Sequence, residues 1–127
     1  RHLDWSPQLS ALGFVVLFPD SYGSHGLGAQ CLVRDRTVRP GKERVADAVL
    51  AKQWLQRRSD IDAKRVSLLG WSNGGSAVLW ATAANRKPKD DLPDFHAAVA
   101  HYPLYRPPPH SAERSDRPRG PHLMLLP

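Results

Sequence analysis

Residues 65–75 read Arg65-Val66-Ser67-Leu68-Leu69-Gly70-Trp71-Ser72-Asn73-Gly74-Gly75. The apolar run 66–69 predicts a short buried strand, and residues 76–84, mostly small and apolar, predict a helix. Between them stands Gly-x-Ser-x-Gly, the pattern of a sharp strand-to-helix turn, which we call the elbow (residues 70–75). Such a turn holds a serine hydroxyl clear of its own backbone, where a base can activate it. The pattern therefore nominates Ser72 as a nucleophile.

The neighbours of Ser72 fit this interpretation. Strand and helix pass close together at such a turn, so the residues two before and two after the serine are expected to be small, as Gly70 and Gly74 are. The backbone N–H of Asn73 is expected to point at a developing oxyanion near the helix N-terminus. Trp71 and Gly75 complete the elbow. The alternative is a glycine-rich turn without chemistry.

The rest of the chain predicts strands that alternate with helices. Such alternation is typical of parallel β-α-β units, and it predicts an α/β fold with a mostly parallel sheet covered by helices on both faces. We expect an apolar stripe on the helix over residues 43–58 and a long functional loop over residues 20–40. The other expected elements are a helix over 5–13 closed by glycine, a buried strand Phe14–Phe18, a buried strand Phe95–His101, and a strand that begins at His122.

Composition restricts the class of protein. The 127 residues suffice for one domain, and 41% hydrophobic and 24% charged residues are ordinary for a soluble globular protein. No apolar run is long enough for a membrane span, so we expect a soluble protein without a membrane partner. Its compartment, cytoplasmic or periplasmic, stays open. The net charge of +6 is spread along the chain among acidic residues, which argues against a nucleic-acid partner. No spacing of His, Cys or carboxylates predicts a metal site.

Three segments resemble the α/β-hydrolases, and within them the dienelactone hydrolase-like branch. They are Phe18-Pro19-Asp20-Ser21-Tyr22-Gly23 after a strand, Arg44-Val45-Ala46-Asp47-Ala48 opening a helix, and the elbow with its strand. The best-known dienelactone hydrolases have cysteine at the position of Ser72. That difference favours a broader hydrolase of carboxylic esters or lactones.

The resemblance implies a catalytic triad. Ser72 would attack the carbonyl carbon, and a histidine oriented by an acid would take and return the proton. In this fold the acid and the histidine follow the nucleophile along the chain. The resemblance therefore implies that both lie beyond Pro127 and that a second oxyanion donor lies before Arg1. Residues 1–127 would then be one partial hydrolase domain.

Other residues are candidates for the pocket wall. His101 follows from its place at the carboxyl end of a predicted strand, the edge where α/β sites gather, although it is a wall residue rather than a base in this interpretation. Tyr22 and His25 lie in the long loop. The expected substrate is a small ester or lactone, with no cofactor and an undetermined oligomeric state. Two alternatives remain: a serine peptidase related to prolyl oligopeptidases, which share Gly-x-Ser-x-Gly-Gly, and a catalytically inactive binding module.

Overall fold

A computed structural model describes residues 4–30, 32–104 and 118–125. Its centre is a parallel sheet with strand order β1-β2-β3, in which β1 is Leu68–Trp71, β2 is Ala98–His101 and β3 is His122–Leu125. The register aligns Gly70 with Ala100 and Trp71 with His101. The carboxyl ends of β1 and β2 therefore lie side by side at the edge of the sheet where the elbow begins.

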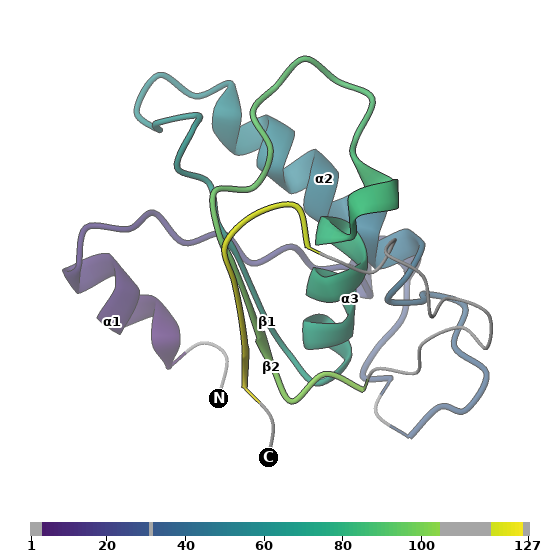
Figure 1. The fold of residues 1–127 in the computed structure, drawn as a ribbon. Coiled ribbons are helices and arrows are strands. Elements are labelled where there is room, and N and C mark those ends of the chain that lie inside the picture. Colours follow the sequence, from purple (N-terminus) through teal and green to yellow (C-terminus); the bar gives the residue numbers. More distant parts are fainter. Residues whose placement is uncertain (1–3, 31, 105–117, 126–127) are drawn as a thin grey trace.

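Helices cover both faces of this sheet (Figure 1), as the alternation of elements predicts. Helix α3 (Asn73–Thr82) packs on β1 and β2, and α2 (Glu43–Gln56) packs against α3. Helix α1 (Trp5–Ala11) lies on the opposite face. Two short 3-10 helices, η1 (Gly23–His25) and η2 (Ala84–Arg86), lie in connecting segments.

The apolar core lies between α3 and the sheet. Its buried members are Val78 of α3 and the alanines Ala98 and Ala100 of β2, with Leu68 and Leu79 packed beside them. Small side chains on β2 allow α3 to approach the sheet closely. This close approach fixes the first turn of α3, and with it the elbow, against the strand ends.

Helix α1 ends as the sequence predicts. Gly13 has a φ of +86°, its N–H donates to the carbonyl of Ser10, and the N–H of Phe14 donates to the carbonyl of Leu9. These two hydrogen bonds form a Schellman motif, in which glycine takes the left-handed conformation that other residues adopt at a cost.

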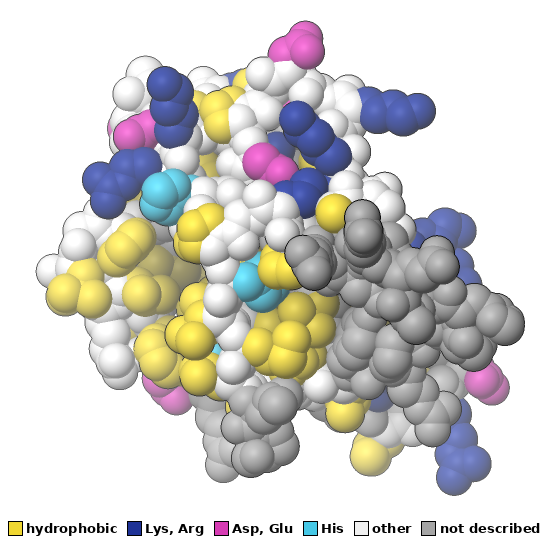
Figure 2. All heavy atoms as spheres, in the orientation of Figure 1, with side chains coloured by type: hydrophobic (Ala, Val, Ile, Leu, Met, Phe, Trp, Pro, Cys, Tyr) yellow, Lys and Arg dark blue, Asp and Glu magenta, His cyan; other side chains and the backbone are white. Residues whose placement is uncertain are grey.

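The prediction of a buried strand at Phe14–Phe18 is wrong for this structure. The segment pairs with no strand among the described residues, and Phe14 and Val15 are 53% and 57% exposed. An apolar run becomes a strand only where a neighbour takes up its backbone N–H and C=O groups. Figure 2 shows other exposed hydrophobic side chains over α1 and the β3 edge of the sheet.

The remaining elements are confirmed with shifted boundaries. The strand before the elbow begins at Leu68 rather than Val66, β2 begins at Ala98 rather than Phe95, and α3 spans 73–82 rather than 76–84. Because α3 begins directly after Ser72, the serine is the N-cap residue of that helix. Helix α2 ends at Gln56, two residues before the expected end.

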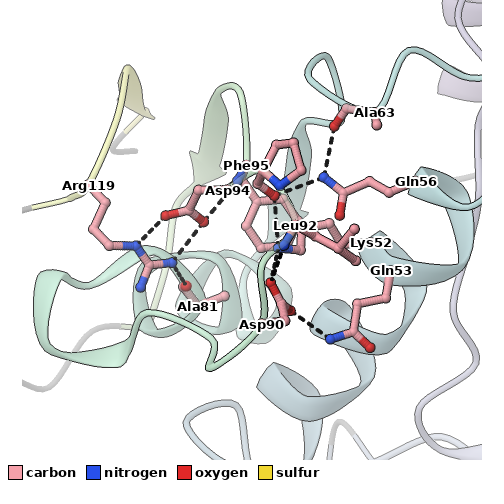
Figure 3. A network of polar contacts seen from close by, with 11 residues as sticks. Lys52, Gln53, Gln56, Ala63, Ala81, Asp90, Leu92, Asp94, Phe95 and Arg119 are labelled. Atoms are coloured by element: carbon pink, nitrogen blue, oxygen red, sulfur yellow. Dashed lines mark hydrogen bonds and ion pairs between the residues drawn. The ribbon is translucent and has the colours of Figure 1, made fainter.

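Helix α2 buries polar residues where an apolar stripe was expected. Its buried residues are Lys52 and Gln56, whereas the predicted stripe is only partly buried. Lys52 Nζ donates to the Pro93 carbonyl at 3.0 Å, and Gln56 Nε2 donates to the same oxygen at 2.8 Å. Figure 3 shows this network, which ties α2 to the segment that leads into β2.

A second part of that network fixes the C-terminal end of α3. Arg119 forms a two-bond ion pair with Asp94 at 2.6 and 3.1 Å, and its other N–H groups donate to the carbonyls of Ala81 and Ala83. A planar guanidinium can satisfy all of these acceptors at once. The segments before β2 and before β3 are thereby attached to the helix that carries the elbow.

Candidate active site

Ser72 has a strained backbone. It lies between β1 and α3 with φ +51° and ψ −118°, and residues other than glycine rarely adopt such a positive φ. Two backbone hydrogen bonds hold it there: Ser72 N–H donates to the His101 carbonyl at 2.9 Å, and Ser76 N–H donates to the Ser72 carbonyl at 3.0 Å. A strained residue fixed from both sides is the geometry of a nucleophile elbow.

The glycines of the elbow differ in how much room they have. A Cβ on Gly70 would lie 2.5 Å from the carbonyl carbon of Gly74, so strand and helix pass as closely as predicted. A Cβ on Gly74, by contrast, would meet only the Arg44 side chain at 3.8 Å, an ordinary contact. The crowded glycine on the helix side is Gly75, whose Cβ would lie 2.8 Å from the His101 oxygen. The steric prediction thus holds at Gly70 and is wrong at Gly74.

Asn73 is the first residue of α3, and its backbone N–H has no acceptor within the helix. Its side chain is held firmly. Arg44 Nη1 donates to Asn73 Oδ1 at 2.6 Å, and the Tyr22 hydroxyl donates to the same oxygen at 3.3 Å. The Arg44 guanidinium also lies over the Tyr22 ring, 5.3 Å from its centroid. Three distant segments of the chain therefore meet at the residue directly after Ser72.

Tyr22 was expected at the pocket wall, and the structure brings it to the elbow. Arg44 was not expected there. One feature of the sequence could have pointed to Arg44: a cation in the first turn of a helix faces the positive end of the helix dipole, which is unfavourable. Arg44 is the second residue of α2, so the stability of that helix does not explain why an arginine stands there.

His101 contacts Ser72 through its backbone rather than through its ring. The ring stacks on Trp71, with 5.4 Å between centroids and 17° between planes, and Trp5 of α1 lies 5.8 Å from Trp71. Because side chains alternate along a strand, Trp71 and His101 share the sheet face opposite Gly70 and Ala100. His101 is thus part of an aromatic cluster, and its role as a pocket-wall residue stays a prediction.

The other described histidines form no hydrogen bond with Ser72. His25 is exposed at the end of η1, in the loop that carries Tyr22. Burial lowers the pKa of the His122 imidazole, which lies on β3. A base and an acid for Ser72 therefore remain a prediction from the family resemblance.

The described residues form neither a membrane span nor a metal cluster. Helices in ranges 4–30, 32–104 and 118–125 are all too short or too polar to cross a membrane. Those ranges also contain no group of three or more His, Cys, Asp or Glu side chains able to hold a metal ion.

Comparison with known proteins assigns the family. The model of the prolyl oligopeptidase family, an α/β-hydrolase domain, matches residues 1–108, a range that includes Tyr22, Arg44, the elbow and His101. Neither a curated protein nor a solved structure matches the chain. The predicted superfamily is confirmed, whereas the dienelactone hydrolase-like branch is not. With a strained strand-to-helix turn at Ser72, a parallel sheet between helices and a match over most of its length, the chain belongs to the prolyl oligopeptidase family of α/β-hydrolases.

Proposed function

We propose that this protein is a serine peptidase that cleaves a peptide bond through an acyl-enzyme at Ser72. The observation that carries the proposal is the strained backbone of Ser72, the N-cap of α3, within a chain of the prolyl oligopeptidase family. A strained serine at the start of a helix presents its hydroxyl above the strand ends, where α/β enzymes bind their substrates.

The chemistry proceeds in two steps. Ser72 Oγ attacks the carbonyl carbon while a base takes its proton, and the tetrahedral oxyanion accepts a hydrogen bond from Asn73 N–H. The base then protonates the leaving amine, the C–N bond breaks, and water releases the acyl group by the reverse sequence. The family resemblance assigns the base role to a histidine oriented by an acid.

Carboxylic esters and lactones are the second candidate substrates. The three segments that resemble dienelactone hydrolases favour them: residues 18–23, residues 44–48 and the elbow with its strand. An acyl-enzyme mechanism cleaves an ester at least as readily as an amide, because an alcohol is a better leaving group than an amine. Ester turnover alone therefore does not identify the natural substrate class.

The test compares matched substrates on the intact protein. An aminoacyl p-nitroanilide and the p-nitrophenyl ester of the same acyl group are assayed with the wild type and with Ser72→Ala. We expect turnover of both substrates and a loss of at least about 10³-fold in Ser72→Ala. Turnover of the ester alone would reject a peptidase in favour of an esterase. Equal activity of Ser72→Ala, or no activity of the wild type on either substrate, would reject the acyl-enzyme and favour a binding module.

A further inference from the structure

The Asn73 side chain is held by two donors from outside the elbow. The Arg44 guanidinium reaches it from α2 at 2.6 Å, and the Tyr22 hydroxyl reaches it from the preceding loop at 3.3 Å. Both donate to one oxygen, Oδ1, so the side chain has little freedom to rotate. Asn73 is also the residue whose backbone N–H faces the developing oxyanion in the proposed mechanism.

The position of the Arg44 guanidinium is unfavourable for local stability. Its two terminal nitrogens lie 3.8 and 3.9 Å from the point where a Gly74 Cβ would stand, so a cation covers the first turn of α3. Arg44 itself is in the first turn of α2. A cation near a helix N-terminus opposes the helix dipole.

The Arg44 Nε atom adds to this cost. It is buried, and no described residue accepts a hydrogen bond from it. A buried donor without a hydrogen-bond partner destabilises the folded state. Residues held in energetically unfavourable positions are characteristic of functional sites.

A developing negative charge reverses the sign of the electrostatic term. When the oxyanion forms beside Asn73 N–H, the charge of Arg44 and the dipole of α3 both favour it. The hydrogen bond to Oδ1 at the same time fixes the residue that supplies the N–H. The stacked Tyr22 ring limits the movement of the guanidinium.

We propose that Arg44, supported by Tyr22, is a positioning residue that orients the Asn73 N–H toward the oxyanion by gripping the Asn73 side chain. This proposal rests on the proposed function of Ser72. It assigns Arg44 a role in the transition state rather than in substrate binding. The expected signature is a loss in kcat with little change in KM.

A double-mutant cycle on the intact protein tests the proposal. Arg44→Met keeps much of the aliphatic volume, and Asn73→Ala keeps the backbone N–H but removes Oδ1. We expect each single variant to lower kcat about 10-fold or more, less than the 10²–10³-fold of a lost oxyanion donor. Because part of the effect of Arg44 passes through Asn73, the loss of kcat in the double variant is expected to be smaller than the product of the two single losses. Arg44→Lys is expected to recover part of the loss, since an ammonium can still donate to Oδ1.

Two further variants keep the outcome interpretable. Arg58→Met is the matched control. Arg58 follows the end of α2, and it also pairs with an oxygen acceptor, Asp60, and lies over an indole ring, that of Trp54. We expect its kcat to equal that of the wild type. Should Arg44→Met fail to fold, Tyr22→Phe removes a single hydroxyl and is expected to lower kcat about 2- to 5-fold, the effect of one weak hydrogen bond; an unchanged kcat there would overturn the proposal.

The outcomes separate this proposal from the function on which it rests. Losses that multiply in the double variant, or a rise in KM at unchanged kcat, would overturn the role of Arg44 while Ser72→Ala still abolished turnover. Full activity of Ser72→Ala would overturn both. Loss in Ser72→Ala together with a non-additive cycle supports both.

Discussion

Gly75 in the first turn of α3 lies directly against His101 at the end of β2: a Cβ on Gly75 would lie 2.8 Å from the carbonyl oxygen of His101. The same oxygen accepts the hydrogen bond from Ser72 N–H at 2.9 Å. The strained conformation of Ser72 therefore depends on how closely Gly75 lets the helix approach the strand end. The third residue after the serine is as important to the elbow as the glycines of the sequence pattern.

Gly75→Ala is expected to destabilise the protein by about 1–3 kcal/mol, the usual cost of overpacking against atoms that cannot move. Gly74→Ala is the matched control. Its Cβ meets only the flexible end of Arg44, so the substitution is expected to be neutral or to stabilise the helix by up to about 1 kcal/mol. Denaturant unfolding of the two variants measures both effects. Equal destabilisation by the two substitutions would contradict the assigned contacts.

Lys52→Met is expected to cost little. Lys52 is 1% exposed, and its removal leaves no acceptor without a partner, because the Pro93 carbonyl keeps Gln56. Asp90 keeps its hydrogen bond from Gln53 at 2.7 Å. Methionine fills most of the same volume, whereas Lys52→Ala leaves a cavity and is expected to cost at least about 2 kcal/mol more than Lys52→Met. The free energies of unfolding decide between this prediction and an essential buried charge, for which both variants would be equally damaging.

The stability of the α2 N-terminus is expected to depend on acid pH. The backbone N–H and guanidinium of Arg39 donate to the Glu43 carboxylate and lower its pKa from 4.5 to about 2. The carboxylate binds its proton less readily in the folded state than in the unfolded state. Its contribution is therefore fully present above pH 4.5 and is lost as the pH falls toward 2.

Glu43→Gln tests this dependence. We expect the wild type to exceed the variant in free energy of unfolding near pH 6, and the difference to shrink as the pH falls from 4.5 to 2. Titrations of both proteins by urea unfolding give the difference directly, because the other carboxylates contribute equally to the two. A difference that stays constant over that range would contradict the assigned role of Arg39.

The sequence predicted what depends on neighbouring residues. Gly70 and Ser72 predict the elbow because strand, turn and helix follow one another directly along the chain. Gly13 announces the end of α1 for the same reason. Phe14–Phe18 was assigned wrongly, because a strand needs a partner that its own residues do not specify.

The contacts of Arg44 and Lys52 could not be predicted from local pattern. Arg44 reaches Asn73 across 29 positions, and Lys52 reaches Pro93 across 41. In both cases the helix position alone favours a solvated cation. Only the packing of α2 against α3 and the segment before β2 shows that these side chains have fixed partners.

The most direct test of the central claim is to locate the adduct of a fluorophosphonate probe. Such probes phosphonylate an activated serine, and a tryptic fragment spanning residues 66–86 contains Ser67, Ser72 and Ser76. Tandem mass spectrometry of that fragment from the labelled intact protein is expected to place one phosphonyl group on Ser72, with no label in Ser72→Ala. An active protein that carries the label on another residue, or whose turnover survives saturating probe, would contradict the account.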